Sequence, residues 1–85
     1  MDIQEVKKTI KEVVENTANI PAAELTDDTN LKDDLELDSL TLLEIALGVD
    51  QAFDLDLPEE ELGKMTTVQV SAELVIEALA KKATP

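Results

Sequence analysis

The sequence predicts an all-α domain made of four helical segments, one of them short. Apolar residues recur at spacings of three and four over long segments, and no segment of any length alternates as a half-buried strand would. At 85 residues the chain has the length of a single domain, 1–85. Phe53 is its one aromatic residue, so we expect a core of Leu, Ile, Val and Ala.

Two long helices are predicted in the first two thirds of the chain. The first covers about residues 3–16, begins after Asp2, and carries an apolar stripe at Ile3, Val6, Ile10 and Val13. The second covers about residues 39–53. On a helical wheel its main apolar arc consists of Leu42, Ile45, Ala46, Val49 and Phe53. The opposite side of the helix consists of Thr41, Glu44, Gly48 and Gln51.

Two further helices are predicted in the last third. A short one over about residues 59–64 follows Pro58, which suits the first position of a helix, and Gly63 would close it. The last covers about residues 67–82, with Thr66 and Gln69 as a capping box. Its buried face is expected at Val68, Ala72, Val75, Ile76 and Leu79.

The connection between the first two helices, residues 17–38, is unusually long. Loops of this length in a compact domain usually carry function. Its leucines predict that it is pinned to the core at several points: Leu25, Leu31, Leu35 and Leu37. Because it is long enough to cross a neighbouring helix, we expect the first two helices to run roughly parallel.

A second apolar strip lies on the 39–53 helix, apart from the main arc. It consists of Leu40, Leu43 and Leu47, and Glu44 and Asp50 lie on its borders. Another element of the chain could cover this strip, or a partner could bind it. The acids on its borders favour a partner.

The charge of the chain is strongly acidic and unevenly distributed. The net charge is −13, and residues 24–61 hold fourteen acids against one base, Lys32, while the remaining acids and bases balance. Such a charge argues against nucleic-acid binding, where phosphates need cations. A local negative field favours basic partners.

The composition also argues against an enzyme. Without Cys or His the chain has no usual zinc ligand and lacks the commonest general base and the strongest nucleophile. It also has no disulfide, no run long enough to span a membrane and no signal-peptide pattern. We therefore expect a cytoplasmic protein, and the dense charge favours a monomer.

Ser39 stands at the predicted start of the second long helix. Asp38 and Ser39 can be a capping pair, which explains such residues at most helix starts. The same position suits a covalently attached phosphate, because free N–H groups and the helix dipole stabilise an anion there. No His and no Gly-x-Ser-x-Gly turn accompany Ser39, so a hydrolase nucleophile is excluded.

The run Leu35-Glu36-Leu37-Asp38-Ser39-Leu40 resembles the modification motif of acyl carrier proteins, whose core is Asp-Ser-Leu. The resemblance extends over nearly the whole chain. Other segments similar to the family are Asp27-Asp28-Thr29, Leu31-Lys32-Asp33-Asp34-Leu35, Phe53-Asp54-Leu55-Asp56-Leu57-Pro58 and Lys64-Met65-Thr66-Thr67-Val68.

This resemblance implies a four-helix bundle with a short third helix and a long first loop. It implies that a phosphopantetheinyl transferase (holo-acyl carrier protein synthase) moves 4′-phosphopantetheine from coenzyme A to Ser39. The arm then carries acyl groups as thioesters between ketosynthase, acyltransferase and other synthase enzymes with basic docking patches. The implied partner-binding residues are Asp38, Leu40, Leu43, Glu44, Leu47, Asp50 and Asp56. The implied acyl-chain pocket is Ile45, Ala46, Val49, Leu57, Leu62 and Met65.

Two positions depart from the family pattern. Thr41 stands where fatty-acid carriers commonly have an acid, and Gly48 begins a stretch that replaces an acidic run. Fatty-acid and polyketide pathways therefore both stay open. The alternative function is an acidic helical interaction module or weak divalent-cation binder. We expect no specific calcium loop over residues 50–61, since its turn position is Leu55 rather than Gly.

Overall fold

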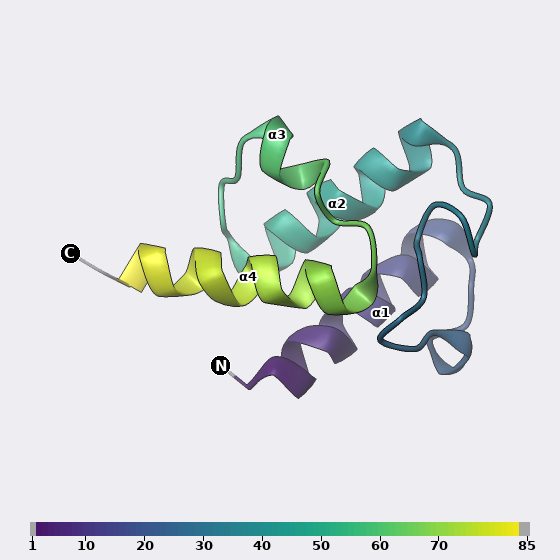
Figure 1. Ribbon diagram of the computed structural model, residues 1–85, viewed down its shortest axis with the longest axis horizontal. Helices are drawn as coiled ribbons and strands as arrows, with labels where there is room; N and C mark the ends of the chain where they lie inside the picture. The colour runs from purple at the N-terminus through teal and green to yellow at the C-terminus, as the bar shows by residue number, and fades with distance from the viewer. Residues whose placement is uncertain (1, 84–85) are drawn as a thin grey trace.

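A computed structural model describes the backbone of residues 2–83, with all their side chains except those of 59, 82 and 83. Its elements are α1 (Ile3–Ala18), the 3₁₀ turn η1 (Ala22–Glu24), α2 (Ser39–Phe53), α3 (Glu59–Leu62) and α4 (Val68–Ala83) (Figure 1). Within this range the only β-type pairing is one isolated bridge, between Asn30 and Thr67. The prediction of an all-α fold with a short third helix and a long first loop is confirmed.

The ends of α1 are set by its caps. Asp2 accepts a hydrogen bond from the Gln4 amide at 3.0 Å, as a capping residue should. The helix ends at Ala18 rather than near residue 16, because Asn19 adopts the left-handed conformation (φ 63°) and its amide donates to the Glu15 carbonyl at 2.9 Å.

The two C-terminal helices also differ from their predicted bounds. α3 ends at Leu62 instead of residue 64, and a turn at Gly63 follows it. α4 begins at Val68, and its cap is Thr67, whose Oγ1 accepts from the Val70 amide at 3.0 Å. The predicted capping box of Thr66 and Gln69 is therefore wrong.

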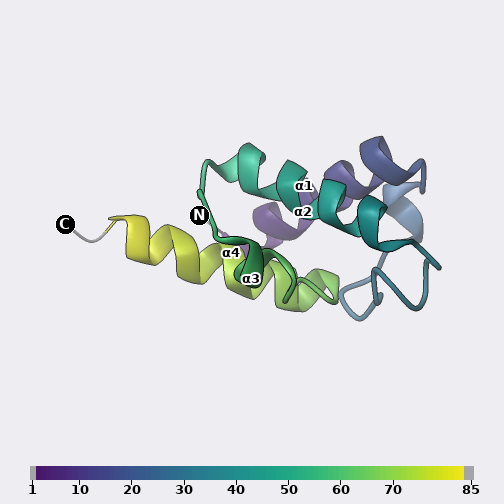
Figure 2. The same cartoon turned by 90° about the horizontal axis from the view of Figure 1, so that it is seen from above.

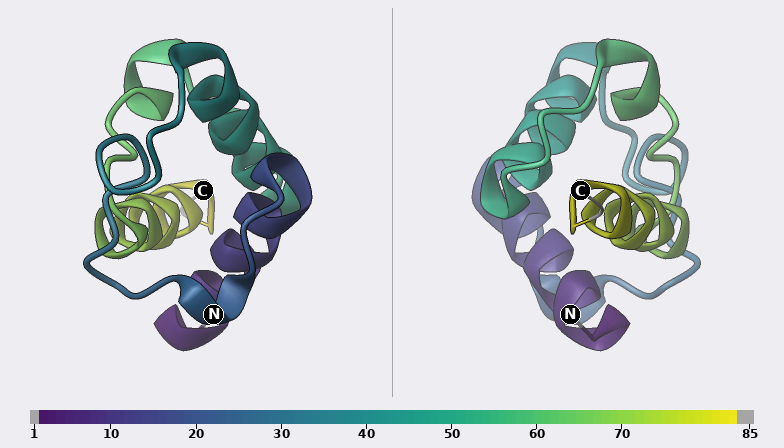
Figure 3. Two further views of the ribbon diagram at one scale, coloured as in Figure 1. Left: turned by 90° about the vertical axis from the view of Figure 1, so that its right-hand side faces the viewer. Right: turned by 90° about the vertical axis from the view of Figure 1, so that its left-hand side faces the viewer.

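The direction of the helices also differs from the expectation. α1 runs along the long axis of the 39 Å molecule, and α2 and α4 return in the opposite direction (Figures 1 and 2). α1 and α2 are thus antiparallel, not parallel. The start of α1 and the end of α4 lie at one end of the molecule, and the start of α2 lies at the other. Viewed along this axis, α1, α2 and α4 enclose a common interior, with α3 between α2 and α4 (Figure 3).

The long loop uses its length to reach α4 rather than to follow a neighbouring helix. The Leu31 amide donates to the Thr66 carbonyl at 2.8 Å, and the Gln69 amide donates to the Asp27 carbonyl at 3.0 Å. An ion pair of 3.0 Å joins the same Asp27 to Lys7 of α1, whose side chain is only 8% exposed. The loop is thereby fastened to both α1 and the start of α4.

The core is aliphatic, as the composition predicts. Leu25 and Leu31 of the loop are buried in it, and Leu35 and Leu37 are half-buried against it, so the loop is pinned as expected. Phe53 is also only half-buried. The remaining buried apolar residues are Val6, Ile10, Val14, Ile45, Ala46, Val49, Leu62, Met65, Val68, Ala72 and Val75.

α1 and α2 pack closely at Gly48. A Cβ atom at this position would lie 2.8 Å from Cγ1 of Val13, closer than packed carbon atoms approach. Gly48 therefore faces α1. The helical-wheel prediction, which put Gly48 on the side of the helix opposite the apolar arc, is wrong at this position. No helix within residues 2–83 combines the length and apolar character needed to cross a membrane.

Candidate functional site

Ser39 is the first residue of α2 and is exposed to solvent. The preceding residue, Asp38, caps the helix: its Oδ1 accepts from the Thr41 amide at 2.8 Å. The Ser39 hydroxyl has no hydrogen-bond partner among the described residues. Of the two roles considered for Asp38 and Ser39, capping belongs to Asp38, so the Ser39 hydroxyl is available for another purpose.

The hydrogen bond that caps α2 also favours the charged form of the Asp38 carboxyl, which precedes Ser39 in the chain. The hydrogen bond from the Thr41 backbone amide lowers the pKa of Asp38 below its ordinary value of 3.8, and the Leu40 amide adds to the effect. Asp38 is therefore ionised near neutral pH. Near neutral pH Ser39 thus lies beside a negative charge and at the positive end of the α2 dipole.

A cavity of about 380 Å³ opens beside Ser39, between α2 and the segment from α3 to the start of α4. The predicted acyl-pocket residues Ala46, Leu62 and Met65 line it. Sequence reasoning missed the rest of its wall, which consists of Lys32, Leu42, Leu43, Gly63 and Thr66. Such a small, largely apolar space next to a free hydroxyl can shelter a hydrocarbon group attached through Ser39.

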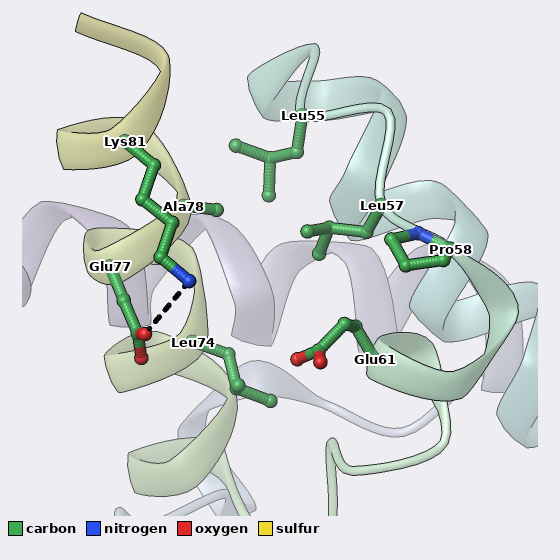
Figure 4. A pocket seen from close by; sticks show the side chains of 8 residues that line it. All are labelled: Leu55, Leu57, Pro58, Glu61, Leu74, Glu77, Ala78 and Lys81. Carbon is green, nitrogen blue, oxygen red and sulfur yellow. Dashed lines mark ion pairs between the residues drawn. The ribbon is translucent and has the colours of Figure 1, made fainter. Parts of the chain in front are cut away.

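The other three predicted pocket residues lie elsewhere. Ile45 and Val49 are 2% and 1% exposed and belong to the packed core. Leu57 lines a different cavity, of about 450 Å³, with Leu55 and Leu74 (Figure 4). That cavity is larger than the one beside Ser39, but Ser39 is not among its lining residues.

The predicted docking residues separate into exposed and partly buried groups. Leu40 and Leu47 are 64% and 40% exposed, and Glu44 is exposed on the same helix. Leu43 instead lines the cavity beside Ser39. Asp50 is half-buried, and its Oδ1 accepts from the Leu57 amide at 3.4 Å, so it also holds the loop after α2.

Asp56 completes the predicted acidic set. It is exposed and adopts a left-handed backbone conformation with φ of 57°. Residues 50–61, which were compared with a calcium-binding loop, are helical at both ends rather than forming one continuous loop. No group of three or more acidic side chains in the described part of the chain is arranged to hold a metal ion.

Comparison with known proteins agrees with this geometry. Residues 8–75 match the family described as phosphopantetheine attachment site. The chain is 34% identical over 77 residues to the acyl carrier protein of Rubrobacter xylanophilus, covering 91% of this chain and 95% of the relative. It is 35% identical over 66 residues to that of Thermobifida fusca, covering 78% and 84%.

A solved structure gives the same result. The fold superimposes on the acyl carrier protein of Enterococcus faecalis with a TM-score of 0.74 at 28% identity, covering 92% of this chain and 99% of that one. The family consists of carriers rather than enzymes, and its members work with a phosphopantetheinyl transferase and with synthase enzymes. The chain therefore belongs to the acyl carrier protein family, whose prosthetic group is 4′-phosphopantetheine.

Proposed function

We propose that Ser39 is the residue that bears the 4′-phosphopantetheine arm of this acyl carrier protein. The observation that supports it is the exposed Ser39 hydroxyl, which the Asp38 cap leaves without a partner at the start of α2. The chain's other serine, Ser71, is 1% exposed inside α4 and out of reach of a transferase.

Attachment requires a second protein. A bond forms between Ser39 Oγ and the phosphorus of coenzyme A that bears the pantetheine arm, and the pyrophosphate bond to the nucleotide part breaks. The hydroxyl proton leaves with a base of the transferase, since this chain has no His and its neighbouring Asp38 is a weak base with a lowered pKa. The positive end of the α2 dipole favours the phosphodiester that results.

The cavity beside Ser39 fits the acyl group that the arm carries. Its apolar wall comes from Leu42, Leu43, Ala46, Leu62 and Met65. Burying each methylene of an acyl chain there gains about 0.8 kcal/mol. We assign acyl shelter to these five residues and leave Ile45, Val49 and Leu57 to the packing of the domain.

Enzymes of fatty-acid or polyketide synthesis, including ketosynthase and acyltransferase, are the proposed partners. The proposed docking surface is defined by Leu40, Glu44 and Leu47, with Asp38 and Asp56 as flanking charges. Its two leucines are exposed apolar contacts and its acids complement basic patches. Leu43 and Asp50 leave this set because the first lines the cavity and the second holds a loop.

Intact mass after incubation with coenzyme A, magnesium and a phosphopantetheinyl transferase tests the attachment site. The wild type should gain one prosthetic group, and so should Ser71→Ala. Ser39→Ala should gain none while keeping its far-ultraviolet circular dichroism, because Asp38 still caps α2. A prosthetic group on Ser39→Ala, or none on the wild type, would refute the proposal.

Association kinetics test the docking surface. Glu44→Lys should slow association with the transferase by on the order of tenfold at low salt, and added salt should shrink the difference, because long-range charge acts mainly on the on-rate. Glu12→Lys, an equal charge change on an exposed position of α1, is the control and should have a smaller effect. Equal rates for Glu44→Lys and the wild type would remove α2 from the docking surface.

A further inference from the structure

Lys32 is a positively charged residue in a strongly acidic segment of the chain, and the acidity of that segment does not explain its presence. It is the one base among the fourteen acids of residues 24–61. The ion pairs of the described chain belong to Lys7, Lys64 and Lys81, and the ammonium of Lys32 has no partner among the described residues. A positive charge here also weakens complementarity to a basic partner, so docking gives no reason for it.

The backbone of Lys32 is anchored on the wall of the cavity that Ser39 also lines. Its amide donates to Oδ1 of Asn30 at 2.9 Å, which fixes the turn. The preceding residue, Leu31, is 2% exposed, and its amide is bonded to the Thr66 carbonyl at 2.8 Å. Lys32, Thr66 and Ser39 all line the same cavity. The lysine stem therefore starts from an anchored point on the cavity wall and carries its ammonium on a flexible four-carbon chain.

The group attached to Ser39 brings a negative charge to this place. A phosphodiester on Ser39 would adjoin the preceding residue, Asp38, which is ionised near neutral pH, in a segment with a large excess of acids. The carboxylate of Asp38 is already occupied by the Thr41 amide and offers no donor. Lys32 is the cationic donor of the cavity wall, and an ammonium–phosphate hydrogen bond is stronger than one between neutral groups.

We propose that the Lys32 ammonium binds the phosphodiester on Ser39 and thereby directs the prosthetic arm toward the cavity. This inference rests on the proposed attachment at Ser39. It gives Lys32 a binding role that is independent of synthase docking. It also predicts that neutralising Lys32 leaves the arm attached but weakens its contact with the cavity wall.

Phosphorus and amide NMR of the fully loaded full-length protein test this role. The phosphodiester resonance of the wild type should move as salt is added, and in Lys32→Gln it should start from a different position and respond less to salt. Amide shift changes between the unloaded and loaded forms at Leu62, Gly63 and Thr66 should fall by about half or more in Lys32→Gln. Lys32→Arg should retain wild-type behaviour.

Lys8→Gln provides a matched control, because Lys8 is an exposed lysine on α1 outside the cavity. Equal effects of Lys8→Gln and Lys32→Gln would overturn the proposal, since general charge would then explain them. Lys32→Gln spectra that coincide with the wild type at every salt concentration would also overturn it. The attachment proposal is tested separately: a phosphodiester resonance that is present in the wild type and absent from Ser39→Ala supports attachment at Ser39 whatever the Lys32 variants show. The two proposals can therefore fail independently.

Discussion

Replacing Gly48 by alanine should destabilise the domain, although alanine is the better helix former. In an exposed helix the change gains about 1 kcal/mol. Here the new Cβ would lie 2.8 Å from Cγ1 of Val13, and valine in a helix has essentially one side-chain rotamer, so the helices must shift. Overpacking of this kind costs about 1–3 kcal/mol, which leaves a net loss of between about 0 and 2 kcal/mol.

A double-mutant cycle isolates the clash from helix propensity. In the Val13→Ala background the space for a Cβ at Gly48 is open, and Gly48→Ala should then stabilise by about 1 kcal/mol. The coupling between the two positions is therefore expected to be about 1–3 kcal/mol. Each kcal/mol corresponds to roughly 4–8 °C in melting temperature for a domain of this size.

Urea unfolding followed by circular dichroism at the helical band measures these values, since the chain has no Trp or Tyr for fluorescence. An unchanged dependence of free energy on urea across the four proteins shows that only native stability differs. A Gly48→Ala protein that is more stable than the wild type, with the same gain in the Val13→Ala background, would refute the reasoning.

Four further substitutions test other contacts. Asp27→Asn should cost about 1–3 kcal/mol because it leaves the buried Lys7 ammonium without its carboxylate, whereas Lys7→Met should cost less, since Asp27 is 47% exposed and can be hydrated. Ser71→Ala should stabilise by about 1 kcal/mol, because Ser71 Oγ is buried with no hydrogen-bond partner. Asp38→Ala should lower the melting temperature near neutral pH. This gap should close as the pH falls through the lowered pKa of the folded Asp38 carboxyl, since the stabilisation is present above the unfolded pKa and lost on protonation.

Urea titrations check the Asp27, Lys7 and Ser71 variants, and thermal melts across acidic pH check Asp38→Ala. Lys8→Met is the control for Lys7→Met. Because Lys8 is an exposed lysine of the same helix, this change should leave the free energy of unfolding almost unchanged. Equal losses in Asp27→Asn and Lys7→Met would contradict the asymmetry. A less stable Ser71→Ala protein, or a melting difference for Asp38→Ala that stays constant in acid, would contradict the other two.

Periodicity predicted the helices well because each long helix buries one stripe. Ile10 of α1 and Val75 of α4 lie where the spacing puts them. Helix ends were predicted less well, because an end depends on one residue's backbone angle, as at Asn19, or on which of two adjacent threonines turns its hydroxyl to the helix, as at Thr67.

The motif around Ser39 predicts an attachment site but says nothing of the cavity wall beside it. A helical wheel gives the direction of a side chain and says nothing of what covers it, so Leu43 was assigned to a docking strip although it lines the cavity. Lys7 and Gly48 could not be interpreted from sequence, since each is explained by a residue far along the chain or on another helix, Asp27 and Val13. The direction of α1 against α2 likewise depends on where the loop is fastened.

The lengthwise arrangement of the helices has a practical consequence for attaching this protein to something else. The described chain starts and stops at one end of the molecule, and α2 starts at the other, in a molecule 39 Å long (Figures 1 and 2). A sensor surface, bead or fused domain joined through either extremity therefore stays on the far side from Ser39. Tethered copies should present their serine outward, and a soluble enzyme should reach it as readily as it does in free solution.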